Sequence, residues 1–311
     1  MVNKMVIFVM LVSLSLLVGP ASAVDLDASM TNQQRQDAIN NADPTDYTVN
    51  FLTSQGTTYS NVSLTAPKDN VEWIGNGVTL VGGGRSIFTI TNRTGLTIKD
   101  FIININNDTA DGITGNNVYN CTIENNVITN GDDGINIYQR YAGLTIRNNT
   151  INNVDRDGIS LVNHDNLTVT SFNALDPTII EDNVIENVVY GIFLGGNFKG
   201  DITGNTIGGS TAGLTITGKP TSGNGKLDAY IADNNIAGIA MECPEVLSLL
   251  LYNNAISQLG ATGYSILTAN FGYAANAIWV VYNQFSAPVD ATFRSSAYVW
   301  ILNFLNGAYY P

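Results

Sequence analysis

The sequence predicts an all-β fold, a single-stranded parallel β-helix of about ten coils preceded by a short N-terminal capping helix. Two columns of residues, one of Asn and one of Gly, recur along the chain at a unit of just over twenty residues. Between them lie short runs in which apolar residues occupy every second position, as in a strand with one buried face. Each repeat is therefore expected to form one coil of short strands separated by turns.

The Asn column defines the repeat. Each Asn follows one apolar residue by three positions and precedes another by two, as in Ile123, Asn126 and Ile128. Upstream, Asn76 fits the same pattern, and Phe101 replaces the Asn of the next copy. Asn at a fixed turn position tolerates left-handed backbone angles, and its amide can bond to the Asn of neighbouring coils. We therefore expect a stacked ladder made of Asn126, Asn149, Asn183, Asn205, Asn234, Asn254, Asn283 and Asn303.

The Gly column locates the insertions. In the first four coils the step from Asn to the next Gly is 8 or 9 residues, whereas the step from Gly to the next Asn ranges from 14 to 25 residues. The largest excesses fall within 163–177 and 218–226, so both loops leave the same side of the solenoid. They are either tolerated excursions or an interaction surface. The second interpretation predicts that a sugar is bound by His164, Asp165, Phe172, Asp176 and Lys219.

Residues 1–23 are typical of a secretory signal peptide, with Lys4, an apolar run to Val18 and a small-residue cleavage site at Ala21-Ser22-Ala23. The mature chain, residues 24–311, is therefore expected to be secreted and associated with the cell envelope, without a membrane span. Without Lys4 the chain has 12 basic and 26 acidic residues, a net charge of 12 − 26 = −14. This balance argues against nucleic acid as a partner.

Two segments flank the predicted coils within a single β-helix domain. Residues 29–42, with Thr31 as N-cap and Pro44 beyond, predict a short helix that covers the first coil. Residues 264–311 are rich in aromatic side chains, which either fill wide final coils or stack on sugars. Cys121 and Cys243 lie several coils apart, too far for a disulfide bond.

The opening of the β-helix resembles a known family. The run from Gln36 to Ala42, Val71-Glu72-Trp73-Ile74-Gly75-Asn76-Gly77 and the triplet Gly82-Gly83-Gly84 are similar to the start of secreted right-handed parallel β-helix proteins of the pectate-lyase-like superfamily. More closely, the chain resembles the Asn-rich adhesin-like surface proteins of archaea over about residues 29 to 305. The resemblance implies a right-handed coil and a secreted protein. It does not imply one activity, because the superfamily includes hydrolases, lyases, epimerases, binding proteins and structural shafts.

Aspartates precede the Gly column on three successive coils, at Asp111, Asp133 and Asp157. Carboxylates one coil apart repel each other by roughly 1 kcal/mol in water and more in a less polar medium. The column should therefore hold a cation such as calcium, pair with a base such as Arg156, or raise at least one pKa. The alternative is that Asp-Gly is simply good turn chemistry at a solvated edge.

Part of this cluster resembles the active site of polygalacturonase-type inverting hydrolases, on Thr109-Ala110-Asp111-Gly112 and Gly131-Asp132-Asp133-Gly134. The resemblance implies that Asp132 or Asp133 is the general acid and that the other carboxylates, Asp111 among them, activate water. The family's Gly-His-Gly and Arg-Ile-Lys motifs have no counterpart, since His164 is the only histidine and lies in a longer loop. A lyase would instead need calcium on the aspartates and an arginine base.

Two classes of function follow from these patterns. The first is an extracellular, adhesin-like protein that binds polysaccharide or another cell-surface component, or serves as a structural element of the envelope. The second is a carbohydrate-active enzyme on an acidic polysaccharide, an inverting hydrolase before a lyase. The missing histidine and basic motifs favour the first class.

Overall fold

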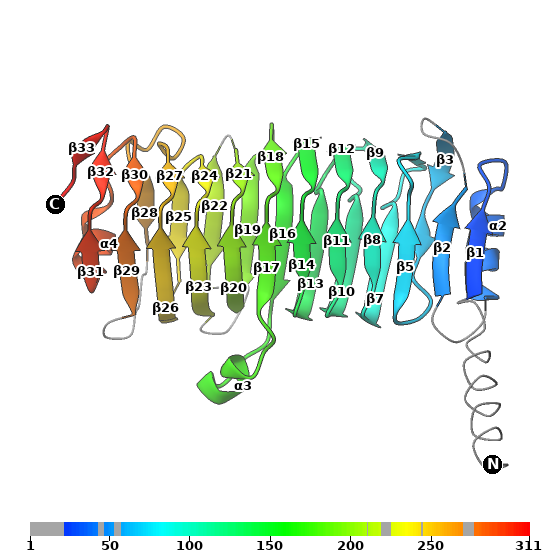
Figure 1. The fold of residues 1–311 in the computed structure, drawn as a ribbon, viewed down its shortest axis with the longest axis horizontal. Coiled ribbons are helices and arrows are strands. Elements are labelled where there is room, and N and C mark those ends of the chain that lie inside the picture. The colour runs from blue at the N-terminus through cyan, green and yellow to red at the C-terminus, as the bar shows by residue number, and fades with distance from the viewer. Residues whose placement is uncertain are drawn as a thin grey trace, which may run out of the picture.

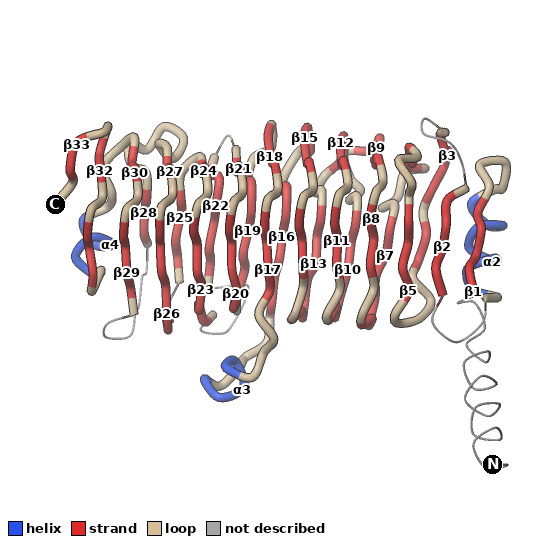
Figure 2. The backbone as a smooth tube through the Cα atoms, in the orientation of Figure 1, coloured by secondary structure: helices blue, strands red, loops and turns tan. Residues whose placement is uncertain are grey.

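The computed structural model describes residues 22–42, 47–52, 57–209, 211–218, 225–243, 245–269 and 277–311. They form a solenoid of about eleven coils, in which the chain advances from one end to the other without crossing back (Figure 1). Figure 2 shows that strands and turns make up nearly all of it, with short helices at both ends and on one loop. The predicted β-helix is confirmed, with about one coil more than expected.

Three sheets form the walls, and all strand pairs are parallel except the last, β32 with β33. Sheet A contains, in order, β1 (Ser22–Leu26), β2 (Tyr47–Phe51), β5 (Val71–Ile74), β8 (Thr97–Lys99), β11 (Thr122–Glu124), β14 (Thr145–Arg147), β17 (Thr178–Glu181), β20 (Phe198–Thr203), β23 (Lys226–Ala232), β26 (Glu245–Tyr252), β29 (Ile278–Val281) and β31 (Val299–Ile301). Sheet B contains β3 (Thr58–Val62), β6 (Thr79–Gly82), β9 (Ile102–Asn107), β12 (Val127–Gly131), β15 (Thr150–Val154), β18 (Val184–Glu186), β21 (Thr206–Ile207), β24 (Asn235–Ile236), β27 (Ala255–Ile256), β30 (Gln284–Phe285), β32 (Phe304–Leu305) and β33 (Ala308–Tyr309). Sheet C contains β4 (Leu64–Thr65), β7 (Phe88–Thr94), β10 (Ile113–Tyr119), β13 (Ile135–Ala142), β16 (Asp157–Asn163), β19 (Tyr190–Gly196), β22 (Ala212–Thr217), β25 (Ile239–Glu242) and β28 (Ile266–Thr268).

The core consists of apolar columns that run along the solenoid. In sheet A, Ile98 pairs with Ile123, which pairs with Ile146, and the column continues through Ile180 and Ile202. All five side chains are at most 2% exposed. A one-residue slip would turn every one of them outward, so the alternating pattern fixes the register between coils.

The asparagine ladder is present at the turn between sheets A and B, and all eight members are buried. Each Nδ2 donates to the Oδ1 of the next ladder Asn, over 2.9–3.2 Å. The same Nδ2 donates to a backbone carbonyl of the preceding coil, as Asn183 does to Ile146. The predicted side-chain stack is therefore confirmed.

Two details of the ladder differ from the prediction. The left-handed residue is the one before each ladder Asn, such as Asn125 with φ 56°. At the last two coils this position is held by Tyr282 and Leu302. Asn76 is exposed and does not join the stack, which ends where Asn126 Oδ1 accepts the N–H of buried Phe101.

Both ends of the described solenoid are covered. Helix α2 (Asn32–Asn40) lies within the predicted range 29–42, and Thr31 forms its capping box with Gln34. At the other end, α4 (Ala291–Ser296) buries Phe293 against the last coils. Residues 1–21, most of the expected signal peptide, lie outside the described residues. Among the described helices, none is both long and apolar enough to span a membrane.

The aromatic C-terminal segment is divided between two roles. Phe285 is buried and stacks on Trp300 with ring centroids 5.8 Å apart, so these rings close the core. Trp279 and Tyr298 instead contact each other on the outside of sheet A and are 44% and 58% exposed. Cys121 and Cys243 are buried and unpaired, in agreement with the prediction.

Candidate functional site

The aspartate column lies at the turn from sheet B to sheet C, immediately before strands β10 and β13 and at the start of β16. The strand register aligns Asp111 with Asp133, then Asp133 with Asp157, because Ile113 pairs with Ile135 and Ile135 with Ile159. The Gly after each aspartate cannot be larger: a Cβ at Gly134 would lie 2.5 Å from Ile151 and 2.6 Å from the carbonyl of Gly158. Tight packing of the turn thus holds the carboxyl groups in place.

A half-exposed arginine, Arg156, forms an ion pair with Asp133. The side chain of Asp133 is fully buried, and Arg156 donates to both carboxylate oxygens, from Nε over 2.9 Å and from Nη2. The backbone N–H of Asp157 donates to the same carboxylate over 2.9 Å. Hydrogen bonding to Asp133 raises the pKa of Arg156, so the guanidinium keeps its positive charge. The predicted pairing with a base is present.

Asp111 and Asp132 gather around this pair. One oxygen of each of Asp111, Asp132 and Asp133 lies within 4.8 Å of the others. Burial, and next the charge of Asp133, raise the pKa of Asp111 to about 6. The same two causes raise the pKa of Asp132, whose side chain is 29% exposed and whose carboxylate lies 3.5 Å from Arg156.

The pKa of Asp157 is raised further than that of Asp111. Asp157 is 5% exposed, and burial together with the charge of Asp133 raises its pKa to about 7. Its Oδ1 atom has no hydrogen-bond partner among the described residues. The predicted rise in pKa is therefore found at Asp111 and Asp157, whereas Arg156 satisfies Asp133.

A second column, which the sequence-based reasoning missed, stands beside the aspartates. The residue three positions after each Asp is Thr114, Asn136 or Ser160, and the register stacks these three with Phe193. Thr114 bonds to Asp111, Ser160 bonds to Asp157, and Asn136 Nδ2 donates to Asp111 over 3.2 Å. The signal in the sequence was the repeated pattern Asp-Gly-Ile followed by a polar residue.

One coil further on, aromatic residues replace both columns. Tyr190 stands in register with Asp157, and Phe193 stands in register with Ser160. Their rings contact each other with centroids 6.2 Å apart, and both side chains are partly exposed. The aromatic pair thus stands one coil from the buried carboxyl group of Asp157, and the partly exposed Asp132 and Asp111 lie further along the same turn.

The comparisons with known proteins agree with this architecture. The family model described as "Right handed beta helix region" matches residues 47–234, more than half of the chain. The chain belongs to this right-handed β-helix family. No curated protein matches it.

Three solved structures resemble this β-helix, each with 14% sequence identity. The cedar pollen allergen jun a 1 has a TM-score of 0.50, with 95% of this chain and 80% of that chain covered. The A-module of the mannuronan C-5 epimerase AlgE6 of Azotobacter vinelandii has a TM-score of 0.46, with 94% and 90% covered. The family 28 exopolygalacturonase of Yersinia enterocolitica has a TM-score of 0.37, with 80% and 47% covered. At this identity the likeness concerns the fold alone.

A calcium ion at the predicted site would have to compete with Arg156 for the carboxylate of Asp133. The group that can approach one ion is Asp111, Asp132 and Asp133, whereas the expectation named Asp157 in place of Asp132. Calcium takes six to eight oxygen ligands. Arg156 and the N–H of Asp157 already occupy the oxygens of Asp133, so two carboxylates remain free of Arg156 hydrogen bonds. Arg156 supplies the positive charge that a cation would bring.

The acid–base assignment of the hydrolase resemblance also changes. Asp133 is fully buried beneath Arg156 and therefore cannot reach a substrate, which leaves Asp132 and Asp111 as the accessible pair. Inverting hydrolases leave room for water with carboxyl groups roughly 6.5–9.5 Å apart. One oxygen of Asp111 lies within 4.8 Å of one oxygen of Asp132, so the two carboxyl groups face the same small volume.

The loop residues predicted to bind a ligand do not act as one group. His164 is exposed, and Asp165 accepts a hydrogen bond from Arg140 over 2.6 Å, next to a cavity that all three line. Phe172, in α3 (Val169–Asn173), is fully buried, so its assignment as a stacking residue is wrong: the ring holds the loop together. Asp176 is exposed, and Lys219 lies outside the described residues.

Proposed function

We propose that this protein is a secreted, adhesin-like β-helix that binds polysaccharide at a cell surface along the outer face of sheet C. The observation that carries the proposal is the placement of the Tyr190–Phe193 ring pair directly beside the carboxyl column that ends at Asp157. Sugars are recognised by ring faces that stack on them and by polar groups that bond to their hydroxyls.

The chemistry of the cluster favours a neutral sugar at this position. The three column aspartates and the adjacent Asp132 share one cation, Arg156. Asp111 is partly exposed and its pKa is raised to about 6, so its carboxyl group donates a hydrogen bond when protonated and accepts one when ionised, which suits sugar hydroxyls. A ligand carboxylate would meet repulsion here.

Calorimetric titration with neutral and acidic oligosaccharides tests the proposal. Tyr190→Ala should weaken binding about tenfold, equivalent to about 1.4 kcal/mol. Tyr252→Ala is the matched control, because Tyr252 is an exposed tyrosine on sheet A. Unchanged binding by Tyr190→Ala would place the ligand elsewhere, and no binding by the parent would favour a purely structural role in the envelope.

Cleavage of an acidic polysaccharide is the second candidate function. It is favoured by the raised pKa of Asp111, about 6, which keeps a proton available near neutral pH beside accessible Asp132. Assays for new reducing ends and for unsaturated products distinguish hydrolysis from elimination. Either product, lost in both Asp111→Asn and Asp132→Asn, would establish an enzyme.

A further inference from the structure

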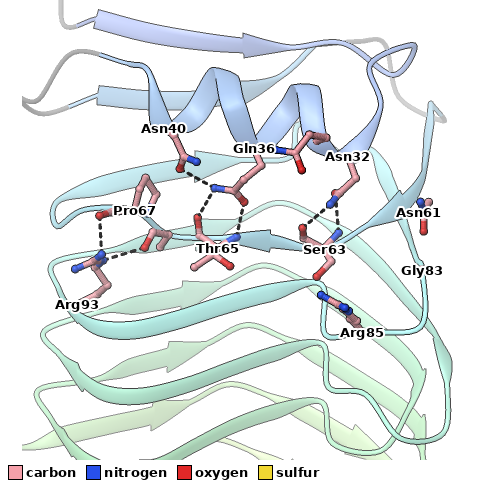
Figure 3. Close-up of a pocket in the computed structure, with 12 residues that line it drawn as sticks. Asn32, Gln36, Asn40, Asn61, Ser63, Thr65, Pro67, Gly83, Arg85 and Arg93 are labelled. Carbon is pink, nitrogen blue, oxygen red and sulfur yellow. Dashed lines mark hydrogen bonds between the residues drawn. The ribbon is translucent and has the colours of Figure 1, made fainter.

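A polar groove lies between helix α2 and the first strands of sheet C (Figure 3). Its Arg85 end is one coil from the first member of the aspartate column, because the N–H of Asp111 donates to Ser86 Oγ over 3.1 Å. Its volume is about 530 Å³. Its polar wall includes Asn32, Gln36 and Asn61, and its cations are Arg85 and Arg93. None of the residues that line it is acidic, although the chain has twice as many acidic as basic residues, 26 against 13.

The helix wall of the groove is held rigidly by paired hydrogen bonds. Asn32 donates to the carbonyl of Ser63 and accepts its N–H, both over 2.9 Å. Gln36 does the same with Thr65, over 3.0 and 2.8 Å. Four residues of helix rise about 6 Å and two residues of strand about 6.6 Å, so the two spacings match. The side-chain amides of Asn32 and Gln36 thus form the hydrogen bonds that a neighbouring strand would form with β4, the edge strand of sheet C. The groove therefore has its shape before a ligand binds.

The two arginines differ in what they are free to do. Arg93 donates to the carbonyls of Ala66 and Pro67, over 2.9 and 2.6 Å, which fixes its charge at one end of the groove. Arg85 is exposed at the other end and forms no ion pair within the described part of the chain. It follows the glycine triplet, in which a Cβ at Gly83 would collide with Asn61. The absence of a side chain at Gly83 therefore allows the backbone to pass close to Asn61, and the next residue but one, Arg85, lies at this end of the groove.

We propose that this groove binds an anionic sugar unit of a polysaccharide, with its carboxylate or sulfate on Arg85 and its hydroxyls on Asn61 and on the second N–H of the Asn32 amide. A planar guanidinium binds such oxyanions through two parallel hydrogen bonds. The edge from Ser63 to Pro67 spans about 13 Å, enough for two or three sugar units.

The test is calorimetric titration of the full chain with three trisaccharides: galacturonate, sulfated galactose and neutral galactose. At least one anionic trisaccharide should bind measurably tighter than the neutral one, and Arg85→Gln should weaken that binding at least tenfold. The two anionic arms identify the group that Arg85 recognises. Arg147→Gln, which removes the same charge from the outer face of sheet A, should leave binding unchanged.

Several outcomes would overturn the assignment. They are equal binding of all three trisaccharides, absence of anionic binding, and Arg85→Gln binding like the parent. Thermal melting checks that Arg85→Gln is folded; within the described ranges Arg85 forms no hydrogen bond that the variant would lose. Tyr190→Ala should retain this binding, which separates the groove from the sheet C proposal.

Discussion

The asparagine ladder and the aspartate column are built in the same way but behave differently. Both stack one residue type coil upon coil at a turn of the solenoid. An asparagine amide donates and accepts, so each member satisfies the next, and the ladder runs unbroken through eight coils. An ionised carboxylate only accepts, so the aspartates need an arginine, a backbone N–H or a proton.

This difference explains where each stack ends. The ladder begins where Phe101 takes the place of an asparagine and continues through every following coil to Asn303. The column lasts for three coils, and Tyr190 and Ala212 then take its place in register. A stack of asparagine amides therefore stabilises the solenoid. A stack of aspartate carboxylates, in which an oxygen replaces each NH₂ group, instead carries charge and is able to act on a ligand.

The largest effect is expected when a carboxylate is placed inside the ladder. Asn183→Asp would set an acceptor against the carbonyls of Ile146 and Glu181 and the Oδ1 of Asn205. We expect a loss of about 3–5 kcal/mol in the free energy of unfolding, measured by urea denaturation. Asn187→Asp, at an exposed amide that bonds to Asn152, is the control and should change little. Equal losses would show that burial of the ladder is not what distinguishes it.

A smaller effect is expected when the column loses its cation. Arg156→Gln leaves the buried carboxylate of Asp133 without a counter-charge, at a cost of about 2–3 kcal/mol at pH 8. We propose that calcium binds weakly to the parent, where Arg156 competes, and more strongly to the variant. Calcium should therefore raise the melting temperature of Arg156→Gln more than that of the parent. If calcium moves neither melting temperature, the carboxylates do not form a cation site.

The smallest effect is expected on the pH dependence of the free energy of unfolding. The pKa of Asp157 is about 7 in the folded chain and near 3.9 when unfolded, so the folded state binds the proton more tightly. This contribution is fully present below pH 3.9 and is lost as the pH rises through 7. Asp157→Asn should remove about 1–3 kcal/mol of pH dependence between pH 4 and 7 relative to the parent. The exposed Asp176→Asn should preserve the parent profile, and a profile unchanged in Asp157→Asn would contradict the assignment.

The repeat made much of the site predictable. The three column aspartates and Arg156 were found from spacing, because parallel coils place equivalent positions side by side. The companions Thr114, Asn136 and Ser160 were missed, because a varied polar position is a weaker signal than an invariant Asp. Phe172 was misassigned because an aromatic ring in a long loop serves the loop's own core as readily as a ligand.

By itself the sequence determined the solenoid, the ladder and the side from which the long loop with α3 leaves. These depend on period and composition, which the stacking of similar coils converts directly into register. Only the tertiary structure decided that Asp133 is buried beneath Arg156 while Asp132 is accessible, and that Asn32 and Gln36 complete the edge of sheet C. Such outcomes depend on side-chain direction and on desolvation by neighbours from other coils, and neither is encoded in the spacing along the chain.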